Sequence, residues 1–226
     1  MKTDSSTTRE GKSAFATIAA AKESGRTSDA IKRIADILLA SIALMLSFPF
    51  WVWAVIAILL TDGRPILYPQ TRVGRGGRIF TIYKFRSMIK EAEKHTGAVL
   101  SDKDDPRVTH VGRFMRKTAL DEIPQLISIF QGDMSWVGPR PERPEFVREF
   151  LLHIPNYSRR YEVKPGLTGL AQVCGHYKST PEEKLFYDLD YLRRRNLWLD
   201  LQIWLLSWAN TLFGRWGAEH ARGIHT

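Results

Sequence analysis

The sequence predicts an α+β fold that is mainly helical and that combines a re-entrant membrane helical hairpin with one small domain. Three observations support this fold class. Residues 37–61 contain no charged side chain, residues 66–85 include two short stretches rich in β-branched and aromatic residues, and most later segments are typical of helices. At 226 residues, the chain is long enough to bury one hydrophobic core with an appendage.

The charge balance is strongly basic. The formal net charge is +9 and the isoelectric point is near 9.8, which favours an anionic partner such as nucleic acid, an acidic lipid surface or a phosphorylated substrate. Cys174 is the only cysteine, so the chain forms neither an internal disulfide nor a cysteine-rich zinc site. We predict that Cys174 is a small buried apolar residue.

Residues 1–30 are rich in Ser, Thr, Lys and Ala and contain few large apolar residues. Such a segment cannot bury enough surface to order itself, so it is predicted to be a disordered tail. It is not typical of a cleaved signal, because the apolar run starts late and no small-residue cleavage site follows it. The predicted division is a tail at 1–30, a membrane hairpin at 31–62 and a cytoplasmic domain at 63–226.

The apolar run at residues 37–61 is the clearest feature of the chain. A straight helix of about 25 residues would cross a bilayer, but Pro49 lies in the middle of the run and Ser47 lies just before it. Because proline removes a backbone donor and clashes with the preceding turn, Ser47 and Pro49 mark an expected break. Each half, roughly 18 Å long, is too short to cross the bilayer alone.

Basic residues flank the run on both sides, with Lys32 and Arg33 before it and Arg64 and Arg72 after it. Cationic flanks prefer the cytoplasmic side of a membrane. A re-entrant helix–break–helix enters and leaves by the same face, so both basic flanks remain on the cytoplasmic side. A straight span would place one of the two flanks on the opposite side of the membrane. Asp36 follows Lys32 by one turn, and it is expected to form a surface ion pair or to anchor the start of the hairpin.

Two strands and a basic turn come next. Residues 66–68 and 79–85 are the expected strands, and residues 72–78, with the sequence Arg-Val-Gly-Arg-Gly-Gly-Arg, form the turn between them. A mixture of Gly and Arg also suits a phosphate cradle, but this turn lacks the Walker spacing and a following helix. A plain basic hairpin is therefore the favoured interpretation.

The remaining elements are predominantly helical. Helices are expected at 88–94, 114–130, 146–152, 182–195 and 197–213, a strand at 170–173, and irregular chain at 96–109. Residues 197–213 carry Trp198, Trp204 and Trp208, but Asp200 and Gln202 make a membrane span unfavourable. Tryptophan favours the headgroup level of a bilayer. This segment is therefore either an amphipathic interfacial helix or a helix packed on the core, and the sequence favours neither.

Two adjacent carboxylates, Asp121 and Glu122, stand between Arg116 and Arg140. Arginines around a carboxylate suit chemistry on a phosphate, because the carboxylate can attack phosphorus or hold a metal while the cations neutralise oxygens. Thr118-x-x-Asp121 also fits a helix-capping box, and acidic residues are common in the first turn of a helix. Taken alone, the stretch favours the capping interpretation.

Several longer motifs occur in a set order along the chain. This order resembles that of the bacterial sugar transferases, the monotopic polyprenyl-phosphate phosphoglycosyl transferases, and the likeness covers residues 31–213. The size resembles the short exopolysaccharide-type members, such as the undecaprenyl-phosphate galactose phosphotransferases. The motifs are Lys32-Arg33-x-x-Asp36, the apolar run with its central proline, Tyr83-Lys84-Phe85-Arg86-Ser87-Met88, Leu120-Asp121-Glu122-Ile123-Pro124-Gln125-Leu126, residues 132–141 and residues 165–173.

The resemblance implies a reaction. A UDP-sugar, with galactose ranked before glucose, gives its sugar-1-phosphate to undecaprenyl phosphate and releases UMP, in the first step of exopolysaccharide repeat-unit synthesis. Asp121 is implied to be the nucleophile that forms a phosphosugar intermediate, with Glu122 as its catalytic partner. Mg²⁺ is the implied cofactor, held by Asp121. The residues implied to contact substrate phosphate are Lys84, Arg86, Arg116 and Arg140.

The same resemblance implies a place at the cytoplasmic face of the bacterial inner membrane, contact with anionic membrane lipid and no nucleic-acid partner. The residues agree with this chemistry, since a carboxylate attacks phosphorus without prior deprotonation and Mg²⁺ takes oxygen ligands. The main rival hypothesis is a basic membrane-bound regulatory or nucleic-acid-binding protein without catalysis. It explains the charge but not the acidic pair. An inactive scaffold with the same fold is a second rival.

Three positions depart from the family pattern. Phe48 separates Ser47 from Pro49 where a Ser-Pro pair is common, which puts the backbone-capping role of the serine in doubt. Ser128 stands where Asn is common, and the shorter side chain of serine is expected to reduce the reach of a polar contact. His176 stands where Arg is common. It is expected either to make a weaker or pH-dependent contact with phosphate or uridine, or to be a surface residue without a role.

Overall fold

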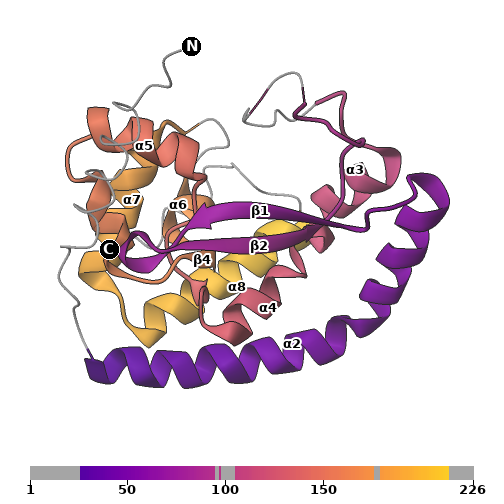
Figure 1. Cartoon of the computed structure of the whole chain (residues 1–226). Coiled ribbons are helices and arrows are strands. Elements are labelled where there is room, and N and C mark those ends of the chain that lie inside the picture. The colour runs from indigo at the N-terminus through magenta and orange to yellow at the C-terminus, as the bar shows by residue number, and fades with distance from the viewer. Residues whose placement is uncertain (1–25, 95–96, 98–104, 176–178, 214–226) are drawn as a thin grey trace, which may run out of the picture.

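The computed structural model describes residues 26–94, 97, 105–175 and 179–213 (Figure 1). Most of this part of the chain is helical, with small sheets, as the sequence predicts. The main elements are α2 (Arg26–Thr61), β1 (Leu67–Val73), β2 (Ile79–Phe85), α3 (His110–Lys117), α4 (Gln125–Gln131), β3 (Ser135–Val137), α5 (Pro144–His153), β4 (Gly166–Thr168), α6 (Leu170–Cys174), α7 (Pro181–Arg194) and α8 (Leu197–Phe213). Short 3-10 helices are η1 (Arg75–Gly77), η2 (Leu120–Glu122) and η3 (Tyr157–Glu162).

α2 is a helix of 36 residues that contains the whole apolar run. It begins at Arg26, so residues 26–30 are helical although they were assigned to the tail, and the rest of the tail lies outside the described residues. Within the described chain, it is the one helix that is long and apolar enough to cross a membrane. Met45, Leu46 and Phe48 are 71%, 68% and 66% exposed, which is unlike the helix of a soluble core.

The helix continues through Pro49, so it is not divided into two separate helices as expected, but its C-terminal part bends away from the line of its N-terminal part (Figure 1). The hydroxyl of Ser47 donates to the carbonyl of Leu44 at 3.1 Å and does not cap a broken end. A proline removes only its own N–H, so a helix can continue past it, and the clash of its ring with the preceding turn favours a bend. Trp51 packs edge-on against Phe85 of β2, with 5.0 Å between ring centres, and this contact holds the C-terminal half against the domain.

Polar contacts fix the N-terminal half of α2 to the domain. Asp36 is buried, and its Oδ1 accepts hydrogen bonds of 3.1 Å from the Ser135 hydroxyl and the Trp136 amide. Lys32 pairs with Asp200 of α8 at 2.5 Å. The predicted surface ion pair between Lys32 and Asp36 is therefore wrong, and the alternative, an anchoring role for Asp36, agrees with the structure. The partners come from β3 and α8, which are far away in the sequence.

β1 and β2 form the predicted antiparallel hairpin, with Leu67 opposite Phe85 and Val73 opposite Ile79. The turn between them contains η1, where Gly76 has a φ of 65° that is costly for any other residue. Exposed and buried residues mostly alternate along β2, which gives the hairpin one face for the core. The predicted hairpin is confirmed, and its first strand is longer than the expected residues 66–68.

Two predicted elements were wrong in type. Residues 88–94 are turns and not a helix, because Met88 pairs with Val108 in an isolated bridge and Glu91 has a φ of 55°. Residues 170–173 belong to α6, and the strand is β4 just before it, which pairs with β3 in parallel. Leu170 and Val173 are buried at helical i, i+3 spacing. A short apolar run does not by itself distinguish such a helix from a strand.

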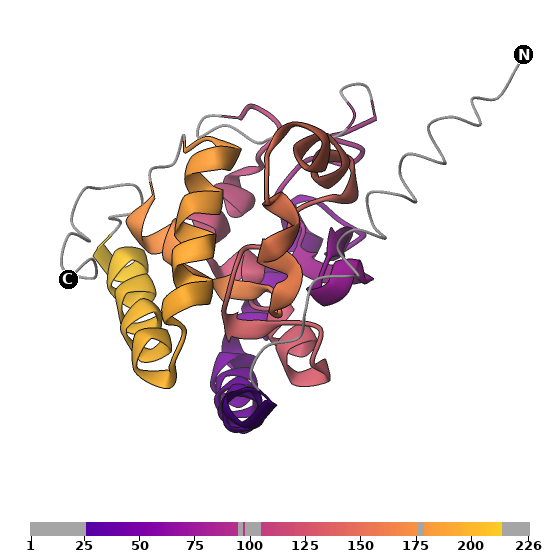
Figure 2. The same ribbon diagram turned by 90° about the vertical axis from the view of Figure 1, so that its left-hand side faces the viewer.

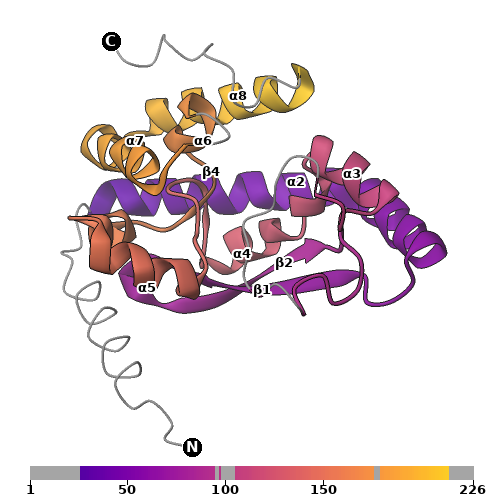
Figure 3. The same cartoon turned by 90° about the horizontal axis from the view of Figure 1, so that it is seen from above.

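The main core lies between α2, α4, α6, α8 and the strands. Figure 2 views α2 nearly end-on and shows the ribbons of the other elements on one side of it. Seen from above, α7 and α8 lie on one side of the line of α2 and the β1–β2 hairpin on the other (Figure 3). α8 has the predicted bounds, and it packs Leu199 and Ile203 into the core while Trp198 remains 66% exposed. Cys174 lies half-buried against this core.

Candidate active site

Glu122 lies at the centre of a charged cluster built by three segments. Its Oε1 accepts hydrogen bonds from Lys84 Nζ of β2 at 2.6 Å and from Arg140 Nη2 at 2.5 Å, and its Oε2 lies 3.5 Å from Arg140 Nη1. The side chains of Glu122 and Lys84 are 19% and 17% exposed. Charge-assisted hydrogen bonds of this kind are roughly twice as strong as neutral ones. Oε1 of Glu122 therefore has two close cationic partners, and Oε2 faces the same Arg140 guanidinium at the longer distance.

Asp121 precedes Glu122 in η2 and is buried, with 7% of its surface exposed. No residue in the described chain donates a hydrogen bond to its carboxylate. Lys84, Arg116 and Arg140 nevertheless lie close enough to lower its pKa through their charges. The two carboxylates therefore differ, because Glu122 is bound by protein cations whereas Asp121 is available to a ligand.

The pKa values of the pair move in opposite directions. Burial, followed by the charge of Glu122, raises the pKa of Asp121 above its ordinary value. Burial would also raise the pKa of Glu122, but Arg140 and Lys84 together outweigh it and hold that pKa well below the ordinary range. Glu122 raises the pKa of Arg140 in return. Adjacent carboxylates with separated pKa values are typical of a site in which the two groups have different roles.

Arg116 reaches this cluster from the last turn of α3, where its Nε donates to the buried Ser87 hydroxyl at 2.9 Å. The helix lies close to the backbone that follows β2, because a Cβ atom added at Gly112 would lie 2.0 Å from the Ser87 carbonyl oxygen. Glycine permits this approach. No local sequence pattern marks Gly112 or Ser87 as a site residue, since their role depends on how α3 packs.

The chain turns sharply between α3 and the two carboxylates. α3 ends just before Thr118, Ala119 has a left-handed φ of 56°, and η2 follows. The predicted single helix over 114–130 is therefore wrong. The capping interpretation is wrong as well, because the Thr118 hydroxyl donates to the carbonyl of Phe114 at the end of α3. A non-glycine residue with positive φ is uncommon, and such strain gathers at functional sites.

The structure brings Lys84, Arg116 and Arg140 together around the acidic pair but places Arg86 elsewhere. Arg86 is buried, and its Nη2 donates to the carbonyls of residues 62 and 63 at 2.7 and 2.8 Å. It closes the C-terminal end of α2 rather than joining the cluster. Ser128 is buried in α4, and His176 lies outside the described residues.

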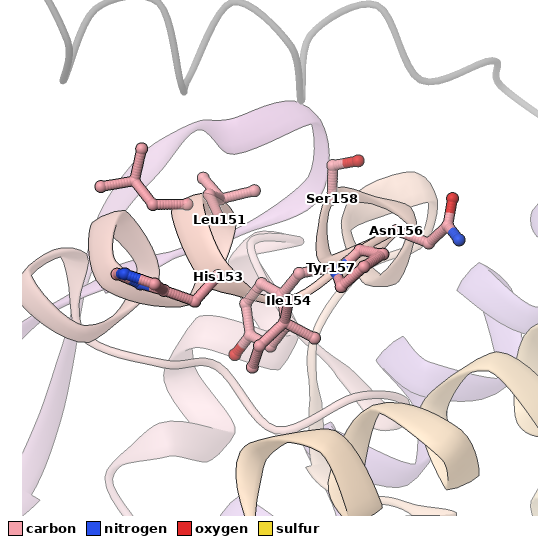
Figure 4. A pocket seen from close by; sticks show the side chains of 8 residues that line it. Leu151, His153, Ile154, Asn156, Tyr157 and Ser158 are labelled. Carbon is pink, nitrogen blue, oxygen red and sulfur yellow. The ribbon is translucent and has the colours of Figure 1, made fainter.

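A surface cavity of about 240 Å³ lies where α5 ends, and residues 151–158 line it (Figure 4). The side chains that Figure 4 labels, among them His153 and Tyr157, come from one continuous segment of the chain. None of the residues of the charged cluster lines it. The cavity is therefore separate from the acidic pair.

The carboxylates fit one particular mode of Mg²⁺ binding. Among the described residues, no group of three or more His, Cys, Asp or Glu side chains forms a metal cage. Mg²⁺ commonly uses one or two carboxylates together with substrate phosphates and water. Asp121 suits this mode because no described residue donates a hydrogen bond to its carboxylate, whereas Lys84 and Arg140 both donate to Oε1 of Glu122.

The chain is similar to known proteins. The family described as bacterial sugar transferase matches residues 27–214. The chain is 43% identical over 176 residues to a UDP-N-acetylgalactosamine-undecaprenyl-phosphate N-acetylgalactosaminephosphotransferase of Aeromonas hydrophila, covering 76% of this chain and 41% of that protein. It is 40% identical over 181 residues to a UDP-glucose:undecaprenyl-phosphate glucose-1-phosphate transferase of Xanthomonas campestris pv. campestris, covering 78% and 37%. It is 35% identical over 207 residues to an undecaprenyl-phosphate galactose phosphotransferase of Salmonella typhimurium, covering 85% and 42%.

The chain spans between 37% and 42% of the length of these three relatives. The family match includes α2, the acidic pair and all of the cations around it. The resemblance inferred from the motifs is confirmed, and the chain belongs to the bacterial sugar transferase family.

Proposed function

We propose that this chain transfers a sugar-1-phosphate from a UDP-sugar to undecaprenyl phosphate and releases UMP. One observation carries the proposal: Lys84 and Arg140 hold Glu122, while the buried Asp121 accepts no hydrogen bond within the described chain. The names of the relatives support the same reaction class, since each describes a transferase that acts on undecaprenyl phosphate. They give no support to a regulatory or nucleic-acid-binding protein.

The first step forms a covalent intermediate. A carboxylate oxygen of Asp121 attacks the β-phosphorus of the UDP-sugar. The bond from that phosphorus to the bridging oxygen breaks, and UMP leaves with this oxygen, while the phosphosugar stays bonded to Asp121. Burial raises the pKa of Asp121, which makes the ionised carboxylate a stronger nucleophile. Lys84, Arg116 and Arg140 stabilise the charge that develops on the phosphoryl oxygens and on the leaving UMP.

The second step transfers the phosphosugar to the lipid. A phosphate oxygen of undecaprenyl phosphate attacks the same phosphorus, the bond to Asp121 breaks, and the free carboxylate returns. The product is undecaprenyl-diphosphate-sugar. Glu122 forms no covalent bond in either step. Its role is to position the Lys84 ammonium and the Arg140 guanidinium beside the phosphoryl oxygens of the substrate.

Mg²⁺ is the proposed cofactor, with Asp121 as its protein ligand. When bound, the ion supplies positive charge that neutralises the diphosphate of the UDP-sugar.

We further propose that α2 enters and leaves the cytoplasmic membrane by the same face, with the domain in the cytoplasm. Both ends of α2 contact the same domain, since Lys32 pairs with Asp200 and the carbonyl of Asp62 accepts from Arg86. A straight span would place these ends on opposite sides of the bilayer. The exposed side chains of α2 and of α8, including Trp198 and Trp208, then lie against lipid. The basic surface supports contact with anionic headgroups.

The test is an assay of UMP release by the purified chain in lipid nanodiscs. Undecaprenyl phosphate and Mg²⁺ are supplied with UDP-galactose, UDP-glucose or UDP-N-acetylgalactosamine, and the galactose and glucose donors are expected to give the highest rates. Without undecaprenyl phosphate, the release should stop near one UMP per enzyme, because the phosphosugar stays on Asp121. No UMP from any donor would contradict the reaction, and UMP release without this limited burst would contradict the covalent intermediate.

A further inference from the structure

The loop that carries Arg140, residues 138–142, is held from three other elements. Each carbonyl from residue 139 to residue 142 accepts a hydrogen bond from a donor outside the loop. Two of the donors are backbone amides of β4 and β1, and the other two are the side chains of the buried Arg160 and the partly buried Arg72. The pairs are Pro139 O with Gly166 N at 2.9 Å, Arg140 O with Arg160 Nη2 at 2.9 Å, Pro141 O with Arg72 Nη1 at 2.9 Å, and Glu142 O with Val73 N at 3.0 Å.

Arg160 is the more deeply buried of the two arginine donors, with 3% of its side chain exposed against 13% for Arg72. It pairs with Asp188 of α7 at 2.8 Å, and the Asp188 side chain is 2% exposed. Its Nη1 donates to the hydroxyl of Tyr157, and the guanidinium carbon lies 5.0 Å from the centre of that ring. A planar guanidinium with five N–H donors serves a carboxylate, a hydroxyl and a carbonyl at once, and a lysine ammonium does not.

Stability alone does not account for this buried pair. Removing two charges from water carries a desolvation cost that the ion pair repays only in part, and apolar replacements of similar volume are often as stable. An apolar replacement would lose the hydrogen bond to the Tyr157 hydroxyl and, of more importance for the acidic pair, the hydrogen bond to the carbonyl of Arg140. That carbonyl belongs to the residue whose guanidinium meets Glu122 at 2.5 Å.

We propose that Arg160, held by Asp188, is a positioning residue for the transfer reaction. It fixes the backbone at Arg140 so that the Arg140 guanidinium meets Glu122 and stays beside Asp121. Arg72 of β1 donates a hydrogen bond to the next carbonyl of the loop, that of Pro141. This inference rests on the proposed function, because it assigns Arg160 to the same site.

The central variant is Arg160→Lys, which keeps a positive charge near Asp188 but does not hold all three partners. A small displacement of a catalytic group lowers rates by as much as about 100-fold, so kcat for UMP release should fall by roughly 10- to 100-fold while KM for the UDP-sugar changes by less than about threefold. The acidic limb of the pH–rate profile should move to higher pH, because Asp121 and Glu122 lose part of the charge of Arg140.

The matched control is Arg159→Lys. Arg159 is the neighbour of Arg160 in η3, its side chain is 44% exposed, and it pairs with Glu162. This variant should keep the wild-type kcat and pH profile. Asp188→Asn provides a second variant that retains side-chain shape and should reproduce the smaller kcat and the shifted profile. If folded Arg160→Lys and Asp188→Asn both keep the wild-type kcat and profile, the inference is overturned.

A second measurement separates this inference from the proposed function. Thermal unfolding without substrate is compared for Arg160→Lys, Arg140→Lys and the double variant. If Arg160 acts through the backbone of Arg140, the decrease in Tm of the double variant should be smaller than the sum of the two single decreases. Additive decreases together with an unchanged kcat would reject the inference while the function stands. Non-additive decreases in a chain that releases no UMP would reject the function and leave the structural coupling in place.

Discussion

Lys84 donates a 2.6 Å hydrogen bond to Oε1 of Glu122, and this contact joins β2 to η2 across 38 positions of the sequence. Burial lowers the pKa of Lys84, while the charge of Glu122 acts against that decrease. Glu122 therefore favours the charged form of this buried lysine. This pairing is what separates the roles of the two carboxylates, because it leaves Asp121 as the one that is available to substrate.

Replacing Asp121 with Asn should abolish transfer and leave the fold intact. The carboxylate accepts no hydrogen bond from a residue the structure describes, so its loss breaks no internal contact and Tm should be unchanged or slightly raised. Glu122→Gln should instead lower the free energy of unfolding by about 1–3 kcal/mol, because Lys84 and Arg140 lose their charged partner. UMP release, thermal unfolding and vesicle flotation measure activity, stability and membrane association. Near-normal turnover of Asp121→Asn would exclude the covalent mechanism.

Transfer should fail on acidification before the protein unfolds. Only the ionised form of Asp121 attacks phosphorus, and burial holds its pKa above the ordinary 3.8, so activity is lost as the pH falls through that raised value. The raised pKa also means that protonation of Asp121 favours the folded state at low pH.

Protonation of Glu122 has the opposite effect on the stability of the folded protein. Its pKa in the folded protein is depressed, so its stabilising contribution is fully present above its ordinary value of 4.5 and is lost as the pH falls below it towards the folded value. The values of kcat/KM and the circular dichroism signal should be followed over the same pH series. Simultaneous loss of activity and structure would contradict the prediction.

Gly112→Ala should destabilise the protein although alanine normally favours a helix. The new Cβ would lie 2.0 Å from the Ser87 carbonyl oxygen, and overpacking of this kind costs about 1–3 kcal/mol. The displacement of α3 should also move Arg116 and lower kcat. Arg113→Ala is the matched control, since Arg113 is exposed on the same helix. Equal stability of the two variants in urea denaturation would show that α3 does not need this close approach.

A cysteine placed at Thr61 should be protected from a membrane-impermeant thiol reagent added at the periplasmic side of intact cells. It should react after the membrane is permeabilised, as should a control cysteine at Ser158 in the domain. The native Cys174 gives little background, because burial raises its pKa to about 11 and leaves little thiolate. Labelling of the cysteine at position 61 in intact cells would exclude a re-entrant α2.

Local patterns determined a large part of the fold. The apolar character of α2, the β1–β2 hairpin with its glycine-rich turn, and the bounds of α8 follow from composition, periodicity and turn residues. The same reasoning failed at residues 114–130. Apolar residues continue there, but Ala119 adopts a left-handed conformation that separates α3 from η2 and that no local residue pattern indicates.

The sequence by itself determined that an apolar helix precedes a basic domain, and that Asp121 and Glu122 lie among cations in a family-specific order. Only the tertiary structure decided which cations serve the pair. Lys84 and Arg140 reach Glu122, whereas Arg86 closes the end of α2. The physical reason is that a motif defines only which residues are neighbours along the chain. The ion-pair partner of a buried charge depends on which distant element packs against it.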